Sequence, residues 1–94
     1  MVEIRWSELA NENMQDIYDF IAKDSTRHAE KELFKVTKRV EVLRTFPNSG
    51  KVVLDFEIET VREIVEGNYR IVYKLFFEDS ITILSVHHHS RLMK

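Results

Sequence analysis

The spacing of apolar residues divides the chain into a helical first half and a strand-rich second half. Residues 2–6 alternate apolar and polar side chains, the pattern of a short strand with one buried face. Two longer segments, residues 8–23 and about 26–45, repeat apolar residues every three to four positions and predict amphipathic helices. The repeating positions are Ala10, Met14, Ile17 and Ile21 in the first segment and Ala29, Leu33, Val36, Val40 and Leu43 in the second. Ser7 is placed to cap the first helix, and a very short break at residues 24–26 makes the pair a helical hairpin.

The second half of the chain predicts turns and strands. Pro47 and Gly50, within the sequence Phe-Pro-Asn-Ser-Gly, end the second helix. Strands are predicted over residues 61–66, 69–77 and 81–87. Gly67–Asn68 is a two-residue hairpin signal between the first two of these strands, and a second turn follows at residues 78–80. Residues 51–60 leave two alternatives open, because Lys51–Leu54 fits either a short edge strand or an extended loop.

The resulting order of elements is β-α-α-β-β-β. This order predicts an α+β fold in which a helical hairpin packs on one face of a mainly antiparallel sheet. The first strand has to return to this sheet after the helices, beside a central strand. With 94 residues, 44% of them hydrophobic, the chain is long enough for one domain over residues 1–94 and too short for two. Because no long heptad seam is present, we expect a monomer or a weak dimer when the protein is free.

Composition and charge exclude several classes of protein. The chain has no cysteine, which excludes disulfide scaffolds, thiolate zinc sites and cysteine nucleophiles and fits a cytoplasmic location. A charge interrupts the apolar residues at the N-terminus, unlike a signal peptide, and no apolar stretch approaches the roughly 20 residues of a membrane span. The formal net charge of −2 argues against unspecific binding to phosphates. Positive charge is nevertheless concentrated in the second predicted helix, whereas residues 55–66 are acid-rich.

Several different short motifs are distributed along nearly the whole chain. They are residues 4–7 leading into 16–22, residues 24–25, residues 43–51, Val61-Arg62-Glu63-Ile64 followed by Tyr69-Arg70-Ile71-Val72-Tyr73, and the closing residues 83–91. Together these motifs resemble the toxins of the RelE/ParE superfamily. The resemblance implies the same β-α-α-β-β-β fold and a toxin of a type II toxin–antitoxin (plasmid stabilisation) system. It also implies neutralisation by an antitoxin whose disordered segment wraps the toxin.

The superfamily divides by target, and the sequence favours one branch. ParE-like members bind DNA gyrase and are not nucleases, whereas RelE-like and YoeB-like members cleave messenger RNA on the ribosome. The Val-Arg-Glu-Ile strand, the Phe-Pro-Asn-Ser-Gly turn and the acidic pI of 6.1 favour the ParE branch. YoeB-like nucleases carry a tyrosine after the near-terminal histidine, where Ser90 stands here, and no tyrosine follows Tyr73. The alternatives are a metal-independent messenger RNA endonuclease and a non-toxic family member retained for binding.

A nuclease would need a cation for the phosphate, a general acid and a general base. The resemblance assigns the phosphate contact to Arg70, whose planar fork suits it, and the general acid to His89. Glu57, in the acid-rich segment, is the candidate general base. A structural alternative for Arg70 is a salt bridge to Glu63 or Glu66 on the neighbouring strand, because an unpaired buried charge is very costly.

Two further sets of residues are predicted to bind proteins. The target-binding candidates are Arg62, Arg70, His88 and Arg91. The antitoxin-binding candidates are the cations on the outer face of the second helix: Arg27, Lys31, Lys35, Lys38 and Arg39. No cofactor is predicted, and no metal site, because His87 and His89 on one strand lack a third ligand. The larger aromatic residues are expected to pack in the core or between helices: Trp6, Phe20, Phe34, Phe46, Tyr69 and Tyr73.

Overall fold

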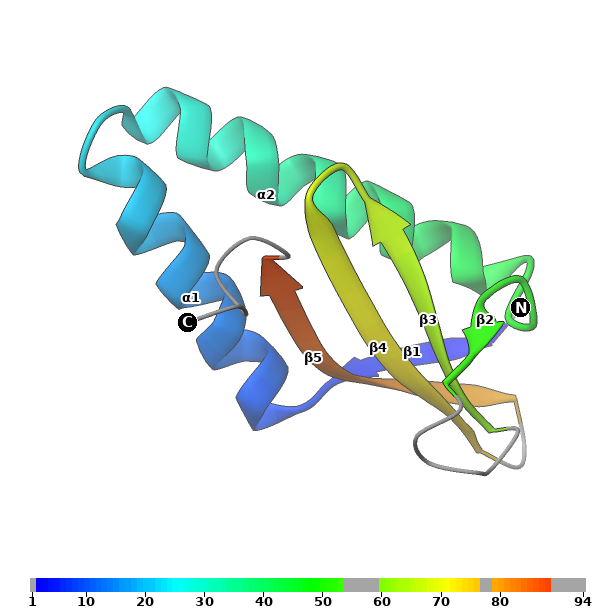
Figure 1. Cartoon of the computed structure of the whole chain (residues 1–94). Coiled ribbons are helices and arrows are strands. Elements are labelled where there is room, and N and C mark those ends of the chain that lie inside the picture. Colours follow the sequence, from blue (N-terminus) through cyan, green and yellow to red (C-terminus); the bar gives the residue numbers. More distant parts are fainter. Residues whose placement is uncertain (1, 54–59, 77–78, 89–94) are drawn as a thin grey trace.

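The computed structural model describes residues 2–53, 60–76 and 79–88 (Figure 1). The chain begins with β1 (Glu3–Trp6) and continues with α1 (Glu8–Ala22), α2 (Thr26–Glu41) and the short 3-10 helix η1 (Val42–Arg44). The strands β2 (Lys51–Val52), β3 (Val61–Glu66), β4 (Tyr69–Phe76) and β5 (Ser80–His88) follow. The predicted order of elements is confirmed, with Lys51–Val52 as a short edge strand.

The described strands form one sheet in the order β1-β5-β4-β3-β2. Only β1 and β5 run parallel, and every other described neighbouring pair is antiparallel. The predicted α+β fold with a mainly antiparallel sheet is therefore confirmed. β1 returns beside β5, an interior strand, and its pairing with β5 joins the two ends of the described chain. Figure 1 shows α1 and α2 lying together over one side of this sheet.

Both helices begin at serine caps that the sequence places directly before them. Ser7 accepts a hydrogen bond from the backbone N–H of Ala10 at 2.9 Å, and Ser25 accepts one from His28 at 3.0 Å. After Glu41 the chain continues as the 3-10 helix η1. The last turn of the helix predicted over residues 26–45 is therefore more tightly wound than an α-helix. In the part of the chain that the structure describes, neither helix is long and apolar enough to cross a membrane.

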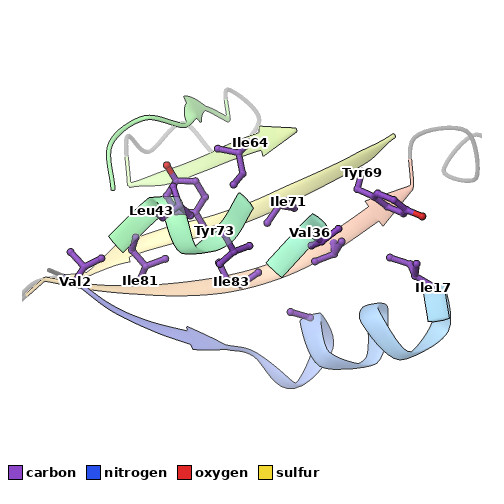
Figure 2. Close-up of a cluster of buried hydrophobic side chains, with 13 residues drawn as sticks. Val2, Ile17, Val36, Leu43, Ile64, Tyr69, Ile71, Tyr73, Ile81 and Ile83 are labelled. Carbon is purple, nitrogen blue, oxygen red and sulfur yellow. The ribbon is translucent and has the colours of Figure 1, made fainter. Parts of the chain in front are cut away.

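The main core lies between the helices and one face of the sheet (Figure 2). Val36 and Val40 of α2 and Ile17 of α1 pack against alternate residues of β4 and β5, including Ile71 and Ile83. A smaller apolar cluster of Val53, Val61 and Val72, with Leu84 packed against it, lies apart from the main core. Because successive strand residues point to opposite faces, this second cluster occupies the face away from the helices, here called the open face.

The prediction for the aromatic residues is partly wrong. Tyr69 and Tyr73 are buried in the core, and Trp6 packs against it. Phe20, Phe34 and Phe46, in contrast, are each more than half exposed. The two helical phenylalanines lie off the buried stripe of their helices, and Phe46 follows η1. Hydrophobicity alone does not bury a residue, since much of any protein surface is apolar.

Candidate functional site

The open face of the sheet brings together four polar residues from three neighbouring strands. Arg70 of β4 is paired in register with His87 of β5, and Val72 of β4 is paired with both Glu63 of β3 and Ser85 of β5. Since residues two apart on a strand share a face, Arg70, Glu63, His87 and Ser85 all lie beside Val72 on the open face. We call these four residues the polar cluster.

Arg70 is paired within its own chain. Its Nε donates a hydrogen bond to the Oε1 atom of Glu63. Val65 is the residue of β3 directly opposite Arg70, and Glu63 lies two residues before it on the same face. The side chains are 32% and 21% exposed, so the ion pair is partly withdrawn from water. The sequence left open whether Glu63 or Glu66 would be the partner, and the register of β3 against β4 selects Glu63. This ion pair places a carboxylate beside the cation that an incoming phosphate would need.

His87 is the histidine that the structure places beside Arg70. Its Nε2 lies 2.9 Å from the Oγ of Ser85. Burial lowers the pKa of His87 below its usual 6.5, and the nearby charge of Arg70 lowers it further. His87 is therefore predominantly neutral at physiological pH and is a poor general acid there.

A break in the pairing of β4 with β5 puts His87 on the open face. Tyr73 pairs with Ile83 and Val72 with Ser85, so Leu84 is an extra residue on β5. Before this irregularity Ile81 and Ile83 point into the main core, and after it Val86 does. The alternation of β5 does not predict this feature. Its signal is the three-residue step from Ile83 to Val86, where regular alternation would give two.

His88, a predicted target-binding residue, lies on the opposite side of β5 from His87. Its ring packs edge-on against Tyr69, with centroids 5.2 Å apart and ring planes at 79°. Its role in target binding stays a prediction.

Arg62, another predicted target-binding residue, holds a turn of its own chain. Its Nη1 donates hydrogen bonds to the carbonyl oxygens of Asn48 at 3.1 Å and of Gly50 at 2.9 Å. The buried hydroxyl of Tyr73 accepts a hydrogen bond from Gly50 N–H at 2.9 Å and donates one to Pro47 at 2.8 Å. Strands β3 and β4 thus fix residues 47–50, and Arg62 has a structural role whether or not it also contacts a target.

Three of the predicted site residues, Glu57, His89 and Arg91, lie outside the described residues. Their assignments stay predictions. Of the residues that a nuclease would need, the structure brings only Arg70 together with a histidine and a glutamate, namely His87 and Glu63, among the described residues. Within residues 2–53, 60–76 and 79–88, no three side chains of the metal-binding types lie close enough together to hold a metal ion.

The predicted antitoxin-binding cations form one face of α2. Arg27, Lys31, Lys35 and Lys38 are exposed, and Arg39 is half-buried. Lys35 forms an ion pair with Glu32 at 3.1 Å, and the ammonium group of Lys38 lies 5.7 Å from the centre of the Phe34 ring. This face is directed away from the sheet, because the buried residues of α2 lie on its other side.

Comparisons with known proteins agree with this fold. Residues 4–93 match the family model described as the ParE toxin of the type II toxin–antitoxin system parDE. Among curated proteins, a sequence search found no match. One similar solved structure is the chromosomal ParDE toxin–antitoxin system from P. aeruginosa, with a TM-score of 0.75 and 20% identity over 94% of this chain and 96% of that chain. Another is the toxin–antitoxin complex RelBE2 from Mycobacterium tuberculosis, with a TM-score of 0.55 and 23% identity over 93% and 96% of the two chains.

At these identities the two solved structures show the fold alone. The family model carries more weight, because it matches almost the whole described chain, including both helices and all the described strands except Glu3 at the start of β1. The segments that the resemblance singled out, from Ile4 to the closing β5 strand, lie within the matched range. The chain therefore belongs to the ParE family, the toxins of type II toxin–antitoxin systems.

Proposed function

We propose that this toxin inhibits growth by binding DNA gyrase as a protein ligand and that it does not cleave RNA. Membership of the ParE family supports this target, because gyrase is the target that the resemblance implies for the ParE branch. The negative net charge also supports a protein target over a nucleic acid.

The observation that carries the proposal is the ion pair between Arg70 and Glu63. A nuclease of the RelE type would use Arg70 to bind the scissile phosphate and to offset the charge that develops during cleavage. With a carboxylate already bound to Nε of the guanidinium, an incoming phosphate would meet a negative charge beside the cation and would be repelled by it. The neutral His87 beside this pair is poorly suited to protonate a leaving oxygen.

A supercoiling assay with purified gyrase tests the proposal directly. The toxin is expected to inhibit supercoiling or to increase the amount of cleaved DNA held by gyrase, in proportion to its concentration. A heat-denatured toxin sample controls for contaminants. If an excess of folded toxin changes neither readout, gyrase is not the target.

The polar cluster offers variants that separate a target contact from a structural ion pair. Arg70→Ala removes the cation, whereas Glu63→Gln breaks the ion pair and keeps the cation. If Arg70 contacts gyrase, inhibition is lost in Arg70→Ala and retained in Glu63→Gln. If the ion pair only stabilises the sheet, both variants lower the free energy of unfolding and neither changes inhibition by the fraction that remains folded.

One observation favours the alternative of a messenger RNA nuclease, namely that Arg70 and His87 are paired in register. Transcript mapping after induction distinguishes the two functions. A gyrase inhibitor leaves messages uncut in growth-arrested cells, whereas a nuclease produces cuts phased with codons that disappear in Arg70→Ala. Normal growth on induction without any antitoxin would instead favour a non-toxic family member retained for binding.

The proposed partners follow from the same function. The antitoxin is proposed to contact the cations on the outer face of α2, and the location is proposed to be the cytoplasm, where gyrase acts. Co-expression with the product of the adjacent reading frame tests the pairing, because a cognate antitoxin restores growth and co-purifies with the toxin.

A further inference from the structure

The outer face of α2 and η1 carries exposed apolar residues in a regular line. Phe34 is 62% exposed, Val42 43% and Phe46 60%. Together with Lys38 they are spaced four residues apart, so they lie on successive turns of one helical path. The backbone N–H of Phe46 donates to the carbonyl of Val42 at 3.0 Å, which continues this path beyond η1. We call Phe34, Lys38, Val42 and Phe46 the α2 stripe.

The α2 stripe has no role in the core of the described fold. The opposite side of the same helix supplies the buried residues Ala29, Val36 and Val40, and Leu43 of η1 is also buried. Phe34, Val42 and Phe46 are exposed on one side of the helix, and exposed apolar residues that gather on one side of a protein are typical of docking surfaces. Phe34, Val42 and Phe46 are separated by eight and four residues, and these intervals match the turns of a second helix that lies along α2.

The net positive charge of α2 favours an acidic partner for the α2 stripe. α2 contains five lysines and arginines against three glutamates, although the whole chain has a net charge of −2. The outward face of α1 differs in sign. It also exposes large apolar residues, Leu9 and Phe20, but α1 carries four acidic residues and no lysine or arginine. A neighbouring cation is Lys23 at the C-cap, whose ammonium group lies 5.8 Å from the centre of the Phe20 ring. An acidic helix would thus be attracted to α2 and repelled by α1.

We infer that the α2 stripe is the binding site for an amphipathic helix of the antitoxin. This helix carries aspartate or glutamate residues beside its own apolar face. Phe34 and Phe46 are the anchors of this interface, and the lysines and arginines that flank them bind the acidic residues. The inference rests on the proposed neutralisation by an antitoxin and adds to it the residues and the chemistry of the contact. It assigns no role in target binding to the α2 stripe.

Two charge substitutions on the stripe and one on α1 test the inference. Phe34→Glu and Phe46→Glu introduce a carboxylate at the anchors, and because both sites are exposed the fold is expected to remain intact. Phe20→Glu, at a site that is 53% exposed on α1, is the matched control. With the product of the adjacent reading frame as the probe, Phe34→Glu and Phe46→Glu are expected to raise the Kd by roughly tenfold or more. Phe20→Glu is expected to leave the Kd within about twofold.

Growth assays provide the second measurement. Cells that express Phe34→Glu together with the antitoxin are expected to stay inhibited, because the variant remains toxic but escapes neutralisation. The inference is wrong if both stripe variants bind as tightly as the unmodified toxin, although toxin–antitoxin pairing would then still stand. It is also wrong if Phe34→Glu loses toxicity and keeps its antitoxin affinity, which would make the stripe a target surface. A toxin that binds no neighbouring product at all would refute the proposed neutralisation itself.

Discussion

At Gly50 the structure leaves no room for a side chain. A Cβ atom there would lie 2.4 Å from the hydroxyl of Tyr73, 2.7 Å from its Cε1 and 2.9 Å from the carbonyl oxygen of Glu63. Tyr73 is completely buried, and its hydroxyl is hydrogen-bonded to both Gly50 and Pro47, so the ring cannot turn away. Gly50→Ala is therefore expected to lower the free energy of unfolding by about 2–3 kcal/mol, from overpacking and weakened hydrogen bonds.

A double-mutant cycle with Tyr73 identifies the source of this cost. Tyr73→Phe alone removes the hydroxyl and leaves the N–H of Gly50 and the carbonyl of Pro47 without that partner, for about 1–3 kcal/mol. In the double variant the 2.4 Å contact is absent, and the contacts to Cε1 and to Glu63 remain. The double variant should thus be more stable than the sum of the single effects predicts, by about 1 kcal/mol.

Urea denaturation followed by circular dichroism measures these differences, and Gly67 supplies the control. Gly67 has a φ of 59° and no heavy atom within 4 Å of an added Cβ, so Gly67→Ala carries only the backbone cost, about 1 kcal/mol. Asparagine tolerates positive φ, so Gly67→Asn should recover part of that stability, whereas Gly50→Asn should recover none. Wild-type stability of Gly50→Ala, or strict additivity in the double variant, would refute the steric explanation.

Three further predictions follow from named contacts. Because the pKa of His87 is lowered on folding, the unfolded chain takes up its proton first as the pH falls below 6.5. Stability should therefore decrease from that pH downward, and His87→Gln should reduce the decrease in denaturation curves more than His28→Gln does. Ser7→Ala should cost about 1–2 kcal/mol, more than Ser25→Ala, because Ser7 also donates to the carbonyl of Leu84 at 3.0 Å; equal thermal shifts would contradict this. Raising the ionic strength above about 0.15 M should slow antitoxin association in stopped-flow measurements and change dissociation little.

The order of the elements could be predicted because each element has its own local signal. The apolar stripes of α1 and α2, the serine caps and the Gly67–Asn68 turn are all encoded within a few neighbouring residues. The register of the sheet is not encoded locally, and the extra residue in β5 shows the consequence. Regular alternation after Ile81 and Ile83 would direct Ser85 into the main core. Val86 packs there instead, which shows that the alternation shifts by one residue.

The polar cluster could be predicted only in part for the same reason. The sequence indicates that Arg70 needs a partner, since a half-buried charge among apolar neighbours is costly. Which glutamate serves depends on the pairing of β3 with β4, and which histidine lies opposite depends on the irregularity in β5. The exposure of Phe34 could be predicted, because Phe34 lies outside the apolar stripe of α2. Phe46 follows η1, where no helical stripe indicates which side is buried.

The contacts within the fold also explain why the resemblance identifies the family more firmly than the target. Four residues of the recognised motifs, Pro47, Gly50, Arg62 and Tyr73, are hydrogen-bonded to one another or share a bonded partner. In this chain the set fixes the turn after the second helix against β3 and β4, which is a structural task and not a target contact. Arg62 belongs to this set although it is also a target-binding candidate, whereas Arg70 does not take part in it. The polar cluster, with Arg70 at its centre, is therefore a better place to look for target specificity than the turn that made the family recognisable.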